Sequence, residues 1–452
     1  MIPAGSHERK SMTDTLVAEY IETHRRSQQI HGEAVGHFSG EGATHIMRIS
    51  HPFRPYISHA RGSRKWDVDG NEYIDYIMGH GALLLGHSHP AIVQAVQEQM
   101  ARGVHFGENN ESEVELARLI KLLFPSAERV EFCASGQEAN LLSVRLSRLF
   151  TGRGKILRFA EHYHGWADEL APEGSAGIVA PEVTLIPSND IRKAEEELSS
   201  RQYAAVIMEG GGGILGVQTP LNVEFVLAIQ ELTRSTETIW ILDEVVTGFR
   251  NAPGGYQSQV GVRPDLTTLG KCLCGGLPVG AVAGRADIMD ALSSSISEEK
   301  RVEHGGTWNA LPLVCAAGVA ACRMYQTGEP QRKASELAGL FFRGVKRSLE
   351  ERRLAGRIYG QSIAKLSFDS SGTTGLRGDG SKKGRVADLF HSQSIPVKER
   401  LWLHLMQRGI TTLEGSLFIF SAAHTEQDVQ KTLEALTESI DALIEEGLLK
   451  TS

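Results

Sequence analysis

Apolar and polar residues alternate along the middle of the chain in a pattern typical of a sheet covered by helices. Between about residues 112 and 290, short apolar runs predict buried strands, at 129–135, 155–160, 204–210 and 238–245. The stretches between these runs repeat apolar residues at helical spacing, as in 137–150. Alternating strands and helices imply an α/β fold with a mostly parallel sheet and helices on both faces.

The two ends of the chain follow other patterns. Residues 13–37 predict one polar helix, and 54–78 predict strands around an Asp-Gly turn in WDVDGNEYIDYI. Residues 91–103 predict a helix that stops at a glycine. Near the C-terminus, a charged helix, short strands and a long acidic helix indicate a small α+β domain. The Gly/Ser/Lys-rich segment 371–388 is predicted as an excursion without regular structure.

These patterns divide the chain into four parts. Residues 1–11 resemble the remnant of an expression tag and contain no apolar core of a signal peptide. The other parts are an N-terminal segment that contributes to the small domain (12–75), a large domain (76–328) and a C-terminal small domain (329–452).

The composition of the chain argues against several classes of protein function. With 47 basic and 55 acidic residues the net charge is −8, so the chain has no bulk attraction for nucleic acid or an anionic membrane. No apolar run is long enough for a membrane-spanning helix. The five cysteines form no CxxC pair, which disfavours a disulfide framework and a zinc site and favours a reducing, cytoplasmic location. The His-x-His pairs at 87–89 and 162–164 have no completing ligand set, so we expect no metal.

Two segments carry the candidate chemistry. Asp243 ends the apolar run TIWIL, and the carboxyl ends of strands are where open α/β sheets bind ligands. Lys271 lies among apolar residues and glycines in TTLGKCLCGGLPVG, and a desolvated lysine loses its proton readily and can form Schiff bases. A lysine to hold the cofactor and an acid to pair with its ring nitrogen are what pyridoxal phosphate requires.

The remaining cofactor contacts are predicted from neighbouring segments. CASGQEAN joins a predicted strand to a helix, which places Ser135, Gly136 and Gln137 where free backbone N–H groups bind a phosphate. Tyr163, in HYHGW after another strand, is the candidate that stacks on the cofactor ring.

In this order the segments resemble the class III aminotransferases of pyridoxal phosphate fold type I. The resemblance runs from about Gly42 to the C-terminal helix and includes WDVDGNEYIDY, GHSHP, SGQEA, YHG, DEVVTGFR, PDLTTLGK, GGLPVGA and GTWNALP. Within the class the chain is most similar to glutamate-1-semialdehyde aminomutase and its aminotransferase relatives. GHGALLLGHSHP and ILRFAEHYHGWAD are more similar to the D-phenylglycine aminotransferases.

The resemblance implies roles for individual residues. Lys271 matches the Schiff-base lysine, Asp243 the partner of the ring nitrogen, and Val245 the residue packed against the ring opposite Tyr163. Thr307 matches a threonine that reaches the phosphate of the neighbouring subunit, which implies a homodimer.

The resemblance also implies candidates for substrate binding. Arg48 matches an arginine that can hold a substrate carboxylate, and Glu414 matches a glutamate near it. His80 stands where the aminomutase has a tryptophan, and Gln137 where Thr or Ser is usual.

The predicted reaction is transfer of an amino group between an amino acid, with aromatic, D- and β-amino acids as candidates, and a keto or aldehyde acceptor. The first alternative is an intramolecular aminomutase. A racemase or decarboxylase on the same fold, and a sensor or structural subunit, are further alternatives. The last of these is disfavoured because both Lys271 and Asp243 are present.

Overall fold

A seven-stranded sheet forms the centre of the computed structural model, which describes residues 15–38, 51–171, 175–179, 181–211, 220–368 and 395–451. Its strands in spatial order are β4 (Arg129–Cys133), β10 (Gly280–Gly284), β9 (Leu266–Gly270), β8 (Ile239–Asp243), β7 (Tyr203–Glu209), β5 (Lys155–Phe159) and β6 (Val183–Ile186). β10 runs antiparallel to both of its neighbours, and the other neighbours pair in parallel. The predicted mostly parallel sheet is therefore confirmed, with β10 as the antiparallel strand.

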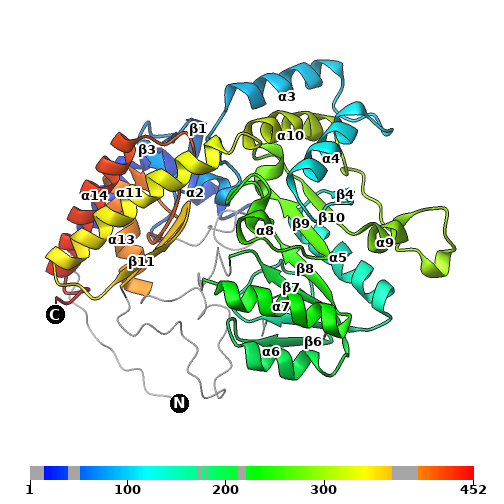
Figure 1. Cartoon of the computed structure of the whole chain (residues 1–452). Coiled ribbons are helices and arrows are strands. Elements are labelled where there is room, and N and C mark those ends of the chain that lie inside the picture. Colours follow the sequence, from blue (N-terminus) through cyan, green and yellow to red (C-terminus); the bar gives the residue numbers. More distant parts are fainter. Residues whose placement is uncertain are drawn as a thin grey trace, which may run out of the picture.

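Successive residues of β7 face opposite helical layers, and all seven are buried. Ala205 and Ile207 belong to the core shared with α5 (Gly136–Thr151). Val206 and Met208 belong to the core shared with α6 (Ile191–Leu198) and α7 (Val223–Thr236), which lie side by side (Figure 1). Because strand side chains alternate between faces, a continuous apolar run packs against both layers at once.

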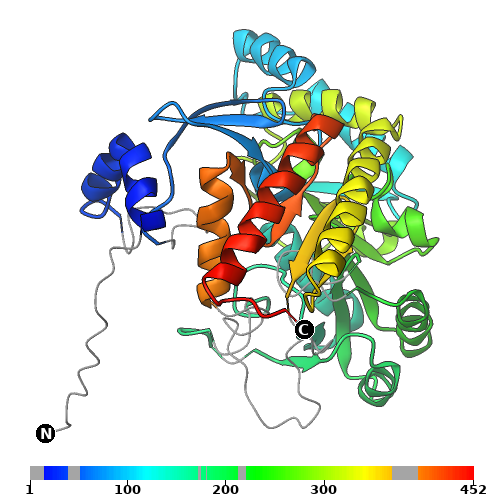
Figure 2. The ribbon, with the colours of Figure 1, turned by 90° about the vertical axis from the view of Figure 1, so that its left-hand side faces the viewer.

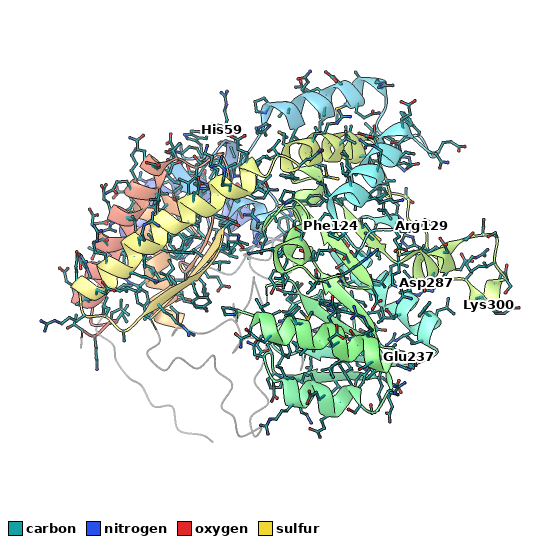
Figure 3. The ribbon with its side chains drawn as sticks, in the orientation of Figure 1. His59, Phe124, Arg129, Glu237, Asp287 and Lys300 are labelled. Atoms are coloured by element: carbon teal, nitrogen blue, oxygen red, sulfur yellow. The ribbon has the colours of Figure 1, made fainter. Side chains whose placement is uncertain are left out.

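A further helical group covers the β4 end of the sheet. It consists of α3 (Pro90–Arg102), α4 (Glu111–Leu123) and α10 (Pro312–Tyr325), and α10 packs on both others. Phe124, labelled in Figure 3, is buried directly after α4, where its ring meets that of Phe249 edge-on at 4.9 Å. This contact joins the helical group to the segment that follows β8.

The C-terminal part of the chain contributes to two small sheets, and the N-terminal strands join it in the first of them. One has the order β1 (Ile57–Arg61), β2 (Arg64–Asp67), β3 (Glu72–Asp75) and β13 (Ile410–Thr411). The other has the order β11 (Arg357–Gly360), β12 (Ile363–Ser367) and β14 (Leu417–Ile419). The accompanying helices are α11 (Glu329–Glu351), α13 (Ile395–Gln407) and α14 (Glu426–Glu445), and α11 lies beside α14 (Figure 1). The domain boundaries at 76 and 329 stay predictions, and the segment 371–388 lies outside the described residues.

The helix predicted over 13–37 is wrong as a single element. The structure has α1 (Thr15–Thr23) and α2 (Arg25–Ala34), which break at His24 and lie at one side of the body, with α1 packed on α13 (Figure 2). The backbone N–H groups of Arg26 and Ser27 donate to the carboxylate of Asp69, at 2.6 and 3.0 Å. Asp69 therefore caps a new helix start from 42 residues away along the chain, measured from Ser27.

Short helical segments complete the described chain: η1 (Met78–Gly81), α8 (Gly255–Val260), η2 (Lys271–Cys274), α9 (Ala286–Met289), η3 (Asp290–Leu292) and η4 (Glu298–Lys300). Within the described ranges, no helix combines the length and the apolar character that a membrane crossing requires.

Candidate active site

A cavity of about 590 Å³ opens at the carboxyl ends of the parallel strands. Most of the predicted cofactor contacts line it: Ser135, Gly136, Gln137, Tyr163, Asp243, Val245 and Lys271. They follow four strands, β4, β5, β8 and β9, that run in the same direction. Residues separated by more than a hundred positions therefore meet because the carboxyl ends of parallel strands share one edge of the sheet.

Lys271 is the first residue after β9 and is half-buried in the cavity wall. Its backbone has a φ of 41°, a left-handed conformation that non-glycine residues seldom adopt. Desolvation lowers the pKa of its ammonium group, and the nearby carboxylates of Asp243 and Glu209 oppose this effect. A lowered pKa increases the share of the neutral amine, which is the form that acts as a nucleophile or a base.

Asp243 ends β8 and is 5% exposed. Its Oδ2 accepts hydrogen bonds from His164 Nδ1 and Asn140 Nδ2, both at 2.8 Å. Its Oδ1 accepts one from the backbone N–H of Val245 at 3.0 Å. Thr268 Oγ1 donates to Asn140 Oδ1 at 2.7 Å, which orients the amide of Asn140. Three donors thus hold this carboxylate in one orientation.

His164 is buried, and desolvation lowers its pKa although Asp243 acts in the opposite direction. A neutral imidazole has one N–H, and the bond to Asp243 assigns it to Nδ1. The other ring nitrogen, Nε2, has no hydrogen-bond partner among the described residues. Sequence reasoning considered His164 only as a metal ligand and missed Asn140. The available signal for Asn140 was its position one helical turn after Gly136.

The first turn of α5, which follows β4 in the chain, lines the cavity. The side chain of Ser135 accepts from the backbone N–H of Glu138 at 3.2 Å and caps the helix. A Cβ on Gly136 would lie 2.7 Å from Val245 Cγ2, so only glycine fits here without displacing Val245. The Gln137 side chain accepts from the Trp166 backbone N–H at 2.7 Å and thereby fixes the loop after β5. Backbone N–H groups thus remain at the N-terminus of α5, where the helix dipole is positive. This geometry binds anions.

Two side chains can hold a flat ring between them. Val245 follows β8 on one wall, and Tyr163 lies in the loop after β5. The backbone N–H of Tyr163 donates to Glu209 Oε1 at 2.6 Å, so a buried carboxylate positions this loop. Burial and Glu209 both raise the pKa of the Tyr163 phenol, which keeps it neutral. Sequence reasoning did not identify Glu209 as part of the site, although it ends a fully buried strand.

The other predicted residues do not line this cavity in the single chain. Thr307 is exposed, and its carbonyl accepts a hydrogen bond from His105 Nε2 at 2.5 Å. Glu414 lies before β14 with its Oε2 3.4 Å from Lys398 Nζ. His80 is half-buried in η1, and Arg48 lies outside the described residues. In the described ranges, no group of three or more His, Cys, Asp or Glu side chains is placed to hold a metal ion.

Comparison with known proteins agrees with this geometry. A family model described as aminotransferase class-III matches residues 46–364. The chain is 35% identical to a glutamate-1-semialdehyde 2,1-aminomutase from Ignicoccus hospitalis, over 92% of this chain and 99% of the relative. It is 38% identical to the enzyme of the same name from Aquifex aeolicus, over 86% and 92%.

Solved structures give the same assignment. A β-phenylalanine aminotransferase from Variovorax paradoxus is 27% identical, with a TM-score of 0.87, over 97% of this chain and 98% of that one. An omega-transaminase from Sphaerobacter thermophilus is 28% identical, with a TM-score of 0.80, over 96% and 98%. With a lysine, an aspartate and a helix start around one cavity, and with matches over nearly its whole length, the chain belongs to the class III aminotransferases, which are pyridoxal phosphate enzymes.

Proposed function

We propose that this enzyme transfers an amino group between an amino acid and a keto acid or aldehyde. The observation that carries the proposal is that Lys271, Asp243 and the first turn of α5 line one cavity. Bound pyridoxal phosphate supplies an aldehyde that captures the substrate amine and a ring that withdraws electrons from the neighbouring carbon. The Variovorax and Sphaerobacter structures, both of transaminases, support this reading.

The residues present fit that cofactor. The backbone N–H groups at the start of α5 would hold the phosphate, and Gly136 lets this helix start lie close against Val245, because a Cβ there would meet the Val245 side chain. Asp243 would face the ring nitrogen, and its three hydrogen bonds keep the carboxylate oriented to stabilise a positive charge. Val245 and Tyr163 would contact the two faces of the ring.

Lys271 would hold the cofactor until a substrate amine replaces it. The freed Nζ would then act first as the base that removes a proton from the substrate carbon and afterwards as the acid that gives a proton back. The lowered pKa of Lys271 favours the neutral amine that this role requires.

Aminomutation within one molecule is the second candidate, because the curated relatives from Ignicoccus and Aquifex carry that name. Two sequence features favour transamination instead. Gln137 replaces a compact hydroxyl, and its side chain is bound to the loop at Trp166. His80 stands where the aminomutase has a tryptophan.

We also propose a homodimer in which Thr307 reaches the phosphate of the partner subunit, in the cytoplasm. Thr307 is exposed, and Trp308 beside it is 62% exposed. Trp166, in the wall of the cavity, is 76% exposed. Two large aromatic side chains with this much exposure are expected where a second copy covers them.

The visible absorption spectrum of the purified protein tests the function. We expect the band of lysine-bound cofactor, either as purified or after addition of pyridoxal phosphate. Single L-, D- and β-amino acids are then added one at a time. Loss of the band with formation of pyridoxamine phosphate and a keto acid establishes transamination and identifies the donor. No band under either condition refutes the assignment.

Further measurements on the same protein distinguish the alternative reactions. Conversion of glutamate-1-semialdehyde to an isomer with no second substrate would establish the aminomutase. Exchange of the Cα proton with solvent, or release of carbon dioxide, without pyridoxamine phosphate would indicate a racemase or a decarboxylase. A control with Lys271→Ala is expected to lose the band and the reaction together.

A further inference from the structure

Arg250 is a buried cation beside the candidate active site. It ends the segment DEVVTGFR, which begins at the last residue of β8, and it is 1% exposed. Its guanidinium donates to the carbonyl of Gly81 from Nε at 3.3 Å and from Nη2 at 2.9 Å. Nη1 donates to the carbonyl of Phe420 at 2.9 Å and to Ser362 Oγ at 3.4 Å. All these acceptors are neutral, and no carboxylate in the described ranges forms an ion pair with Arg250.

The carbonyl of Gly81 connects Arg250 to the candidate Schiff-base lysine. It also accepts a hydrogen bond from Cys272 Sγ at 3.1 Å, and Cys272 follows Lys271 directly in the chain. A Cβ on Gly81 would lie 3.9 Å from Lys271 Cδ and 4.0 Å from Arg250 Nε. The backbone at Gly81 therefore lies beside both the guanidinium and the aliphatic part of the Lys271 side chain.

The turn that ends at Gly81 has an unfavourable backbone conformation. Met78, Gly79, His80 and Gly81 have φ values of 45°, 58°, 55° and 91° in succession. Methionine and histidine seldom adopt this left-handed region, and residues stay there only where their surroundings hold them. The two hydrogen bonds from one planar guanidinium to Gly81 restrain the end of this turn.

The charge of Arg250 also acts on Lys271. Desolvation is the main cause of the lowered pKa of Lys271, and the positive charge of Arg250 acts in the same direction. The carboxylates of Asp243 and Glu209 and the thiol of Cys272 act in the opposite direction. Arg250 is therefore linked to the lysine both by a shared backbone contact and by its charge.

We propose that Arg250 is a positioning residue for Lys271, a role that rests on the proposed function. Its guanidinium holds the Gly81 peptide beside the lysine side chain and joins that peptide to the segments that contain Ser362 and Phe420. An apolar side chain could fill the same space but could not donate to these acceptors. A lysine has no planar fork that reaches the carbonyls of Gly81 and Phe420 together. The geometry thus requires arginine, not only a cation or a filled volume.

Two substitutions separate the position from the charge. Arg250→Lys keeps a cation but not the fork, and Arg250→Met keeps neither. Arg347→Met, at an exposed position of α11, is the matched control for loss of an arginine. Each variant is purified as the holoenzyme. The amino donor is whichever of β-phenylalanine, D-phenylglycine and L-glutamate reacts with the wild type.

The first readout is the rate at which the visible band disappears after the donor is added. A base misplaced by about 1 Å can slow a reaction about 100-fold, so the rate constant at saturating donor should fall about 10- to 100-fold in both Arg250 variants. The half-saturation concentration should stay within about threefold, because neither change removes a contact to the donor. Arg347→Met should match the wild type.

A purely structural role predicts a different result. It would lower the thermal midpoint and leave the rate constant at saturating donor unchanged, and that outcome would overturn the proposal. Full recovery of the rate constant in Arg250→Lys would also overturn it, because the charge alone would then be sufficient. Should Arg250→Met fail to fold, the comparison of Arg250→Lys with the wild type still decides between these outcomes.

A second readout does not depend on catalysis. Hydrogen exchange of the backbone amides in the peptide 78–83, measured by mass spectrometry, reports whether the turn is held. Exchange should be at least about tenfold faster in both Arg250 variants and unchanged in Arg347→Met. Unchanged exchange in the Arg250 variants would overturn the proposal. A wild type that shows no visible band, or that reacts with no donor, would instead count against the proposed function, and hydrogen exchange would still decide whether Arg250 holds the Gly81 turn.

Discussion

Lys365 is buried on β12, and replacing it by methionine, Lys365→Met, should make the protein more stable at neutral pH. Burial, with Lys398 acting in the same direction, lowers the pKa of Lys365 from 10.5 to about 8. Each pKa unit corresponds to about 1.4 kcal/mol, so the charged form destabilises the folded state by roughly 3 kcal/mol at pH 7. Methionine removes this cost but also loses the hydrogen bond to Ser416, worth about 1 kcal/mol. The net gain is about 2 kcal/mol, or a thermal midpoint about 2 °C higher for a chain of this length.

The sign of the pH dependence follows from the same shift. The folded pKa lies below the unfolded one, so between pH 8 and 10.5 the unfolded state binds more protons. The stability of the wild type relative to Lys365→Met therefore rises with pH across this window. The advantage of the variant should be complete below about pH 8 and nearly gone by about pH 9.5.

Thermal unfolding of the two holoproteins at pH 7 and pH 9.5 measures both effects. Lys346→Met, at an exposed position of α11, controls for the general loss of a surface charge. Its midpoint should follow that of the wild type at both pH values. A variant that is less stable than the wild type at pH 7 would contradict the reasoning, and so would an advantage that does not change with pH. Either result would mean that the ammonium group contributes to folding through contacts that outweigh its desolvation.

Three further predictions concern the cofactor. Asn140→Ala removes one of the three hydrogen bonds to Asp243. The dissociation constant for pyridoxal phosphate, measured by titrating the apoprotein, should therefore rise about tenfold or more. An unchanged constant would mean that Asn140 does not orient the carboxylate. Gly136→Ala places a Cβ within 2.7 Å of a neighbouring side chain and should weaken cofactor binding at least about tenfold. Gly32→Ala, in α2, where a Cβ meets no atom within 4 Å, should not weaken it. Equal effects of these two changes would contradict the role of Gly136 in cofactor binding. Thr307→Ala should weaken cofactor binding about tenfold, by loss of one phosphate contact, while light scattering still shows a dimer; a monomeric protein with unchanged affinity would refute the shared site.

Local sequence patterns were sufficient to predict the central elements and the backbone around Asp243 and Lys271. The apolar run before Asp243 predicts a strand buried on both faces, and β8 is that strand. The glycines around Lys271 predict a tight turn, and the residue adopts a left-handed backbone there. Both predictions succeed because the causes lie within a few residues of the side chain concerned.

Contacts between distant segments could not be predicted in the same way. The break at His24 depends on Asp69, whose carboxylate caps α2 from the β2–β3 turn. The roles of Asn140 and His164 depend on their distance from Asp243, which lies 103 and 79 residues away along the chain. No periodicity in the sequence expresses such distances.

Residue patterns predicted an α/β fold, and short motifs made Lys271 and Asp243 the candidates for pyridoxal phosphate, because such patterns and motifs are local properties. The side chains that orient Asp243 could be identified only in the folded structure. Those groups interact through hydrogen bonds of about 3 Å and through charges in a desolvated interior, and such interactions exist only after the sheet has brought its strand ends together.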